Sequence, residues 1–262
     1  MSDFIIDETD LIDEEKMFFN TQVSILKKKF GGRRIDVHGI QNVSELYSFI
    51  DSFIEERSYV NKISFSDSVT LYQLDVFNYI LENYAKEKEV FWPLERSKSG
   101  HYKIYGEQPK GRMNLPYDEY IEKHTKWYEH IRKAQNSDLT IISANAITMN
   151  GEIVSVDGLG NRVSSMIFGP KHVLIIVGKN KIVKNIESAI ERIHNYTAPL
   201  TYIRHANKHY TNHMKLPCVQ TGKCISCSSP ESACMNTVII RGQIHHHADR
   251  IHLIIINENL GF

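Results

Sequence analysis

All four cysteines of this 262-residue chain lie in one stretch, "CVQTGKCISCSSPESAC", at positions 218–234. Thiols clustered at C-x5-C-x2-C-x6-C spacing are typical of metal or cluster ligands, whereas redox chemistry needs only two of them. Structural zinc prefers two C-x2-C pairs and only one is present, while iron–sulfur clusters accept more varied spacings, with three or four cysteine ligands. We therefore predict that the cysteine-rich loop, residues 217–235, holds a [4Fe–4S] cluster, with zinc as the alternative. The predicted ligands are Cys218, Cys224, Cys227 and Cys234.

Polar residues also follow several apolar stretches. Asn145 comes after "LTII", Lys181 comes after "HVLIIVG", and the turn "DGLGNRV" carries Asp157, Asn161 and Arg162. Open α/β folds bind ligands at the carboxyl ends of their strands, where an arginine can pair with a carboxylate and helix-opening amides with an anion. These five residues are candidate substrate-binding residues. A plain β-turn, and a strand-to-helix turn with solvated lysines, are the structural alternatives.

Hydrophobic periodicity places these residues on alternating strands and helices. The pattern predicts strands at 34–40, 61–67, 89–95, 139–147, 151–161, 172–178, 237–242 and 250–257, and helices at 14–30, 45–56 (capped by Ser44), 68–87, 117–135 and 185–196. Several of the strands are apolar on both faces, as in parallel sheets covered by helices on both sides. We therefore expect an α/β fold with a mostly parallel central sheet flanked by helices.

The length fits one domain over residues 16–262, preceded by an N-terminal extension at 1–15. The polar stretch 95–116 is predicted to be a loop, either a lid or an insertion.

Composition excludes several classes of partner. Lys and Arg number 31 and so do Asp and Glu, so no basic face for nucleic acid is expected. The longest apolar runs are too short to cross a bilayer, so we expect no membrane partner. The acidic start lacks the basic and apolar regions of a signal peptide, which favours a cytoplasmic location. In that reducing compartment clustered thiols more often bind metal than form disulfides.

The stretch "SANAITMNGEIVSVDGLGNRVSSMIFGPKHVLIIVGKNKIVKN", residues 143–185, resembles the LUD-domain family, named for lactate utilisation. The downstream "LPCVQTGKCISCSSPESACMNTVII" and "RIHLIIINENLGF" resemble the C-terminal half of its small, stand-alone members. The resemblance extends over about residues 139–262 and, more weakly, 20–94. It implies a fold similar to ribose-5-phosphate isomerase, CoA transferases and glucosamine-6-phosphate deaminase. It also implies a link to L-lactate oxidation, in which some members act alongside iron–sulfur subunits.

The family usually carries a Gly-Gly-Ser-x-Thr loop after an early strand, and this sequence has "SDSVT" there. Ser68 and Thr70 match that loop and are candidate substrate-binding residues by resemblance. Ser66 and Asp67 replace the two glycines, and the charge of Asp67 disfavours an anion at this loop.

Three functions follow as hypotheses. The first is an iron–sulfur LUD-type protein of organic-acid metabolism that binds a small carboxylate and works with a redox partner protein. The second is a non-catalytic regulatory or accessory subunit whose zinc is structural. The third is a CoA-transferase-like enzyme, suggested by fold analogy, with Asp157 or Glu152 as the nearest candidate nucleophiles. Whether the chain is an enzyme stays open, and a homo-oligomer is compatible with all three.

Overall fold

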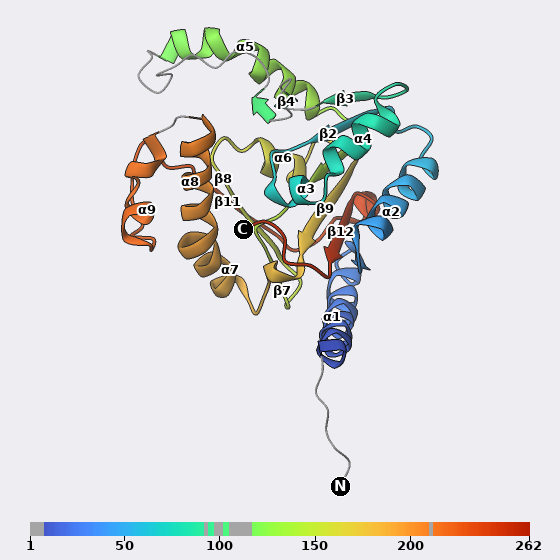
Figure 1. The fold of residues 1–262 in the computed structure, drawn as a ribbon. Coiled ribbons are helices and arrows are strands. Elements are labelled where there is room, and N and C mark those ends of the chain that lie inside the picture. The colour runs from blue at the N-terminus through green and yellow to red at the C-terminus, as the bar shows by residue number, and fades with distance from the viewer. Residues whose placement is uncertain (1–7, 92–93, 97–101, 105–116, 210–211) are drawn as a thin grey trace.

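A computed structural model describes residues 8–91, 94–96, 102–104, 117–209 and 212–262 (Figure 1). Six parallel strands form the central sheet, in the order β1-β12-β9-β6-β2-β3. Their bounds are β1 Asp36–Ile40, β2 Lys62–Phe65, β3 Glu89–Phe91, β6 Leu139–Ile142, β9 His172–Gly178 and β12 Ile251–Ile256. The predicted α/β class with a parallel central sheet is confirmed.

Helices cover both faces of this sheet, which is why its central strands are apolar throughout. On β9, Leu174 and Ile176 pack toward α2 (Val43–Glu55), α3 (Val69–Gln73) and α4 (Val76–Tyr84). The intervening Val173 and Ile175 pack toward α1 (Glu8–Gly31) and α6 (Asn161–Ile167). The alternation of one strand between two cores fixes its register, because a one-residue slip would exchange the two sets of side chains.

A second sheet begins shortly after β6. Strand β6 ends before Ser143, and three residues later the chain enters β7 of a four-stranded sheet with the order β10-β7-β8-β11. Its strands are β7 Ala146–Thr148, β8 Ile153–Asp157, β10 Ile182–Val183 and β11 Asn236–Ile240. The predicted single strand over 139–147 is therefore wrong, because small polar residues at 143–145 let the chain turn from one sheet into the other.

The remaining elements surround the second sheet or connect the strands. They are α5 Tyr117–Ala134, α7 Ile186–Arg192, α8 Ala198–His209, α9 Pro217–Thr221, and the short helical turns η2 Lys179–Lys181, η3 Ile193–Thr197, η4 Asn212–Lys215 and η5 His245–His247. Helix α7 packs on the second sheet through Ala189 and Ile193, against Ala146 and Val154. Among the described helices, none is both long and apolar enough to cross a bilayer.

Several predicted boundaries change. Residues 8–15 of the predicted N-terminal extension form the first turns of α1, and residues 1–7 lie outside the described part. Asn42 caps α2 in place of Ser44, by accepting a hydrogen bond from the Glu45 amide. The helix predicted over 68–87 divides into α3 and α4 at Asp75, whose φ is +49°.

The stretch 95–116, predicted to be a loop, contains part of a two-stranded antiparallel ribbon. Leu94–Arg96 (β4) pairs with Tyr102–Ile104 (β5). Residues 97–101 and 105–116 lie outside the described part.

Candidate functional site

Polar side chains from several elements meet at the carboxyl edge of the central sheet. Thr70 lies on α3, directly after β2, and Ser143 and Asn145 follow β6. Lys181 follows β9, and Arg162 begins α6 after β8. Parallel strands end at the same edge, so these residues become neighbours although they are up to 111 positions apart in the sequence.

Lys181 is the buried centre of this edge, with 4% of its surface exposed. Its Nζ lies 2.9 Å from Thr70 Oγ1, 3.1 Å from Ser143 Oγ and 3.1 Å from the Ala144 carbonyl oxygen. Burial, together with the nearby charges of Arg192 and Arg162, lowers the pKa of Lys181 to about 7. A substantial fraction of the amine is therefore neutral near pH 7, and its lone pair can accept a hydrogen bond from either neighbouring hydroxyl.

The end of the chain covers Lys181. The Gly261 amide donates to Gln73 Oε1 at 2.6 Å, and the Leu260 amide donates to Asn180 Oδ1 at 3.0 Å. Gly261 has a φ of +66°, and a Cβ there would lie 2.5 Å from Thr70 Oγ1 and 3.1 Å from Lys181 Nζ. Only a glycine allows the backbone to approach this closely. The backbone of Leu260 and Gly261 therefore covers Lys181, where the sequence predicted an anion site.

Arg162 is largely used in holding the edge together. Its Nη1 donates to the Ser143 carbonyl at 2.9 Å, and its Nη2 donates to the Val156 carbonyl at 2.6 Å and to Asn145 Oδ1 at 3.1 Å. Its Nε donates to Asp157 Oδ2 at 3.3 Å. The guanidinium therefore joins the exit of β6 to the exit of β8, and most of its donors are not available to a ligand.

Asp157 and Asn145 are anchored in the same network. Asp157 Oδ1 accepts from the Gly160 amide at 2.7 Å, so both of its oxygens have partners. Asn145 Oδ1 accepts from the Val156 amide at 2.9 Å as well as from Arg162. An anchored carboxylate is a poor nucleophile, which weighs against the CoA-transferase role of Asp157.

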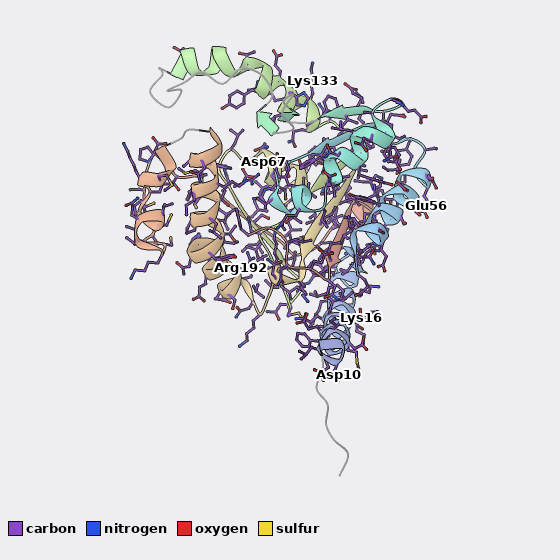
Figure 2. The ribbon with its side chains drawn as sticks, viewed as in Figure 1. Asp10, Lys16, Glu56, Asp67, Lys133 and Arg192 are labelled. Atoms are coloured by element: carbon purple, nitrogen blue, oxygen red, sulfur yellow. The ribbon has the colours of Figure 1, made fainter. Side chains whose placement is uncertain are left out.

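Arg192 is a site residue that sequence reasoning missed. It lies on α7, between the two sheets, and donates to the Asn145 carbonyl at 3.0 Å, to Thr197 Oγ1 at 2.8 Å and to the Asn180 carbonyl at 3.3 Å (Figure 2). Burial lowers the pKa of Arg192. An arginine on the inward face of a short helix whose neighbours are Ala189 and Ile193 was the available sign.

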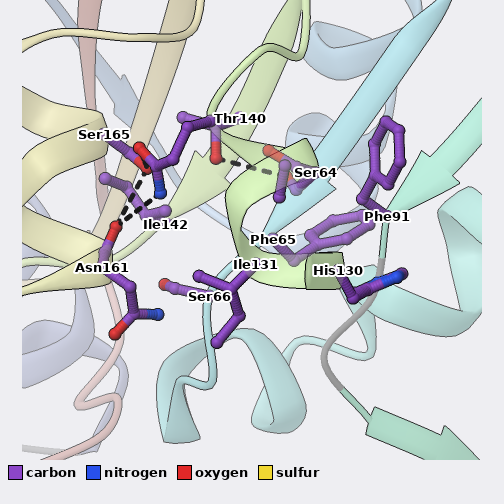
Figure 3. Close-up of a pocket in the computed structure, with 12 residues that line it drawn as sticks. Ser64, Phe65, Ser66, Phe91, His130, Ile131, Thr140, Ile142, Asn161 and Ser165 are labelled. Atoms are coloured by element: carbon purple, nitrogen blue, oxygen red, sulfur yellow. Dashed lines mark hydrogen bonds between the residues drawn. The ribbon is translucent and has the colours of Figure 1, made fainter. Parts of the chain in front are cut away.

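A small polar pocket opens beside this network, between the exit of β2 and helices α5 and α6 (Figure 3). Ser66, Asn161, Ser165 and Gln135 supply polar groups to its lining, and Phe65 and Ile131 supply apolar ones. Ser66 is 5% exposed, and its hydroxyl has no hydrogen-bond partner.

Of the two loop residues predicted by resemblance, Thr70 lies at Lys181, away from this pocket. Ser68 is the N-cap residue of α3, is half-buried and makes no side-chain capping bond. Of the predicted substrate-binding residues, Asn161 thus lines the open pocket, Ser68 lies in neither place, and the others belong to the closed networks of Lys181 and Arg162.

The four cysteines lie on α9 and the segment between α9 and β11, and none forms a disulfide. Cys218 is buried with Tyr202 and Leu216 in a small core of its own, whereas Cys234 is exposed. Burial, and then the neighbouring thiols of Cys234, Cys227 and Cys224, raise the pKa of Cys218, so the four groups share one electrostatic environment. The Ser226 amide lies 3.3 Å from Cys224 Sγ, and the Tyr202 hydroxyl lies 2.9 Å from Cys234 Sγ.

This cysteine loop packs directly on the Asp157 turn. A Cβ at Gly158 would lie 2.8 Å from the Cβ of Ala233, so the two backbones meet where one side chain is absent. Asn236 Nδ2 donates to the Gly158 carbonyl at 2.9 Å, and the Tyr202 hydroxyl accepts from the Ala233 amide at 2.9 Å. The cysteine loop and the carboxyl edge are therefore one continuous structure.

The family model for the LUD domain matches residues 23–256. The chain belongs to the LUD domain family. A crystal structure of a DUF162 family protein from Deinococcus radiodurans is similar at 10% identity, over 92% of this chain and 97% of that chain, with a TM-score of 0.42. No curated protein matches the sequence.

In this LUD domain, sequence reasoning found the edge but missed several of its parts. Ser143, Ser66 and Tyr202 were not predicted as site residues, although each contacts or lies beside a predicted one. Asn161 and Arg162 were expected on a turn at a sheet edge, and they are instead the first residues of α6.

Proposed function

We propose that this LUD domain binds a [4Fe–4S] cluster on its cysteine loop and a small hydroxy or keto acid at the adjoining carboxyl edge, in organic-acid metabolism of the lactate type. The observation that carries the proposal is the contact between the two parts. Four unpaired thiols share one loop, and that loop rests on the Asp157 turn through Gly158 and Ala233.

The sulfur positions do not match a closed zinc site, and the C-x5-C-x2-C-x6-C spacing supports a cluster. A tetrahedral zinc site with Zn–S bonds of 2.3 Å requires sulfurs roughly 3.8 Å apart. Among the described residues, no three cysteine sulfurs lie within 4.8 Å of one another. A cubane cluster suits wider spacing, because each thiolate binds a different iron. The Ser226 amide, close to Cys224 Sγ, is the kind of backbone donor that tunes cluster thiolates.

The pocket beside the edge supports binding of a small polar ligand. The Ser66 hydroxyl is buried without a partner there, and a ligand oxygen would satisfy it. Asn161 lines the same pocket and offers an amide donor, while the adjacent Arg162 provides positive potential without leaving its carbonyl partners. When bound, the cluster would supply one-electron transfer or a Lewis-acidic iron. The protein residues bind and orient the acid and keep water away from it.

A first experiment tests the cluster. Protein purified without oxygen should be brown, with a broad visible band at roughly 400 nm and iron and sulfide in equal amounts. Cys224→Ser and Cys227→Ser should each lose the iron, whereas Ser228→Ala, in the same loop, should keep it. Colourless protein carrying one zinc would favour the accessory-subunit alternative, and iron retained in both cysteine variants would overturn the cluster assignment.

A second experiment tests the ligand site. Calorimetric titration with L-lactate and with pyruvate should detect binding to the wild-type protein, weakened at least tenfold in Asn161→Ala and in Ser66→Ala. Ser164→Ala is the matched control, since this exposed neighbour on α6 does not line the pocket. Equal affinity in all four proteins would show that the acid does not bind in this pocket.

Two further assignments rest on the cluster proposal. Electrons passing through the cluster require a redox partner protein that docks near the cysteine loop. Thiolate ligation favours the reducing cytoplasm as the location.

The part of the carboxyl edge that the structure describes does not favour a CoA-transferase nucleophile, since Glu152 lies at the β7–β8 turn and is hydrogen-bonded to Thr148.

A further inference from the structure

Histidines gather at the opposite, amino edge of the central sheet. His172 begins β9, and His252 is the second residue of the neighbouring strand β12. The loop that leads into β12 brings Asp249 against both rings. Among the described residues, these three form the one set of histidine, cysteine and acidic side chains whose ligand atoms all lie within 4.8 Å of one another. We refer to this set as the histidine cluster.

The ligand atoms of the histidine cluster face a common point. His252 Nε2 lies 3.3 Å from Asp249 Oδ1, and His172 Nδ1 lies 3.8 Å from Asp249 Oδ2. Tetrahedral zinc with N and O ligands at 2.0–2.2 Å places its ligands roughly 3.4 Å apart. The Asp249 carbonyl oxygen lies 2.8 Å from His172 Nδ1 and 3.1 Å from His252 Nε2, where it accepts the ring N–H hydrogen bonds that a bound ion would replace.

Each ring is also oriented from behind. His172 Nε2 lies 2.6 Å from the Tyr59 hydroxyl, and His252 Nδ1 lies 3.8 Å from an Asp36 carboxylate oxygen. Metal-binding histidines characteristically have an oxygen at the nitrogen remote from the metal, which fixes the ring and the tautomer. Here His172 has that hydrogen bond, whereas the Asp36 carboxylate lies beyond hydrogen-bond distance of His252 and acts on it through charge alone; the remaining nitrogens face Asp249.

The histidine cluster is open to solvent on the side of Asp249. Asp249 is 60% exposed, which gives an ion a route from solvent. Arg57 pairs with both Asp249 oxygens at 3.0 and 3.2 Å, and each oxygen keeps a second lone pair for an ion.

We propose that His172, His252 and Asp249 form a second metal site, specific for a divalent transition ion such as Zn²⁺ or Co²⁺ and independent of the cysteine loop. Two imidazoles with a carboxylate are a ligand set for such ions, in contrast to the all-sulfur set of the cysteines. The site lies at the opposite end of β9 and β12 from Lys181 and Gly261.

Equilibrium dialysis against Co²⁺ tests this proposal, with cobalt measured by elemental analysis on anaerobically purified protein that keeps its own metal content. The wild-type protein should bind one Co²⁺ per chain. Asp249→Asn should weaken this binding at least tenfold, and because Asp249 is exposed the variant should fold. His252→Gln should weaken it similarly, and the unchanged circular dichroism of both variants would separate lost ligation from lost structure.

Exposed histidines nearby provide the matched control. His245→Gln with His246→Gln removes two exposed imidazoles of η5 that do not belong to the histidine cluster, and it should leave the binding constant unchanged. Co²⁺ binding that survives Asp249→Asn and His252→Gln would overturn the proposal. Loss of binding in the His245/His246 variant would also overturn it, because the ion would then lie on the surface turn. Loss of binding only in Cys227→Ser would overturn it as well, because the ion would then lie on the cysteine loop.

Discussion

The same strands bury charged or titratable groups at both ends, by different means. At the amino end of β9 and β12, His172 and His252 contact the Tyr59 hydroxyl and both the carbonyl and the carboxylate of Asp249, and the Asp249 side chain is exposed. At the carboxyl end, Lys181 and Arg162 donate mainly to backbone carbonyls and buried hydroxyls. The amino edge can therefore exchange a partner for water or an ion, whereas at the carboxyl edge a lost side chain leaves buried acceptors unsatisfied.

The largest expected effect is the pH dependence of stability that Lys181 causes. Its pKa is about 7 in the folded protein and near 10.5 when unfolded, so the unfolded chain binds more protons between these values. Stability should therefore rise with pH, by roughly 3 kcal/mol between pH 7 and about 9.5. Below pH 7 this contribution should stay level.

Urea unfolding of the wild-type protein and of Lys181→Met across this range measures the difference. Tyrosines and cysteines that titrate in the alkaline range affect both proteins alike, so they cancel in the comparison. Parallel pH profiles for the two proteins would mean that Lys181 keeps an ordinary pKa, and the contrast between the two edges would lose its main support.

The second prediction makes the same substitution at both edges. Arg162→Ala should cost about 2–3 kcal/mol, because it strands the buried carbonyls of Ser143 and Val156. Arg57→Ala should cost about 1 kcal/mol, because Asp249 stays exposed to water and the main loss is packing over Phe53. The free energies of unfolding, from urea titration at pH 7, give both values. Equal costs would show that the two edges do not differ in how they hold their charges.

The smallest expected effect concerns the backbone above Lys181. Gly261→Ala should cost about 1–2 kcal/mol, since the new methyl group would meet Thr70 Oγ1 and the φ is positive. Gly222→Ala, at a φ of +72° with nothing within 4 Å, isolates the backbone strain and should cost about 0.5–1 kcal/mol. The melting temperatures of the two variants, measured by thermal unfolding, show which substitution destabilises the protein more. A larger loss at Gly222 would mean that the chain end moves aside from Thr70 without cost.

Much of the fold follows from periodicity in the sequence. The runs that became β9 and β12 are apolar on both faces, which is the mark of central parallel strands, whereas their pairing with each other was not predicted. The break between β6 and β7 was not predicted either, although Ser143 and Asn145 interrupt the apolar run there. The interruption of the helix at Asp75 was also not predicted. Asp75 has a positive φ, but the apolar residues on either side of it keep the spacing of a helix.

At the site, the sequence predicted which residues gather at the carboxyl edge, but it did not predict their hydrogen-bond partners. Lys181, Thr70 and Arg162 were selected as ligand-binding residues, and they do gather at one edge, yet Lys181 and Arg162 bond largely to the protein itself. Sequence cannot show which carbonyls a guanidinium will reach. The histidine cluster was missed because His172 and His252 are eighty positions apart, although each stands at the start of an apolar strand, and neighbouring parallel strands bring their starts together.

The meeting of Gly158 with Ala233 has a mechanical consequence. Because only the methyl group of Ala233 lies between the two backbones, a displacement of the cysteine loop is transmitted to the Asp157 turn without a flexible side chain in between. Asp157 holds Arg162, and Arg162 holds the exit of β6, so the relay is three residues long. A change in the ligand bound by the four thiols would therefore change the position of Asn161, the pocket residue next to Arg162, at the carboxyl edge of the sheet.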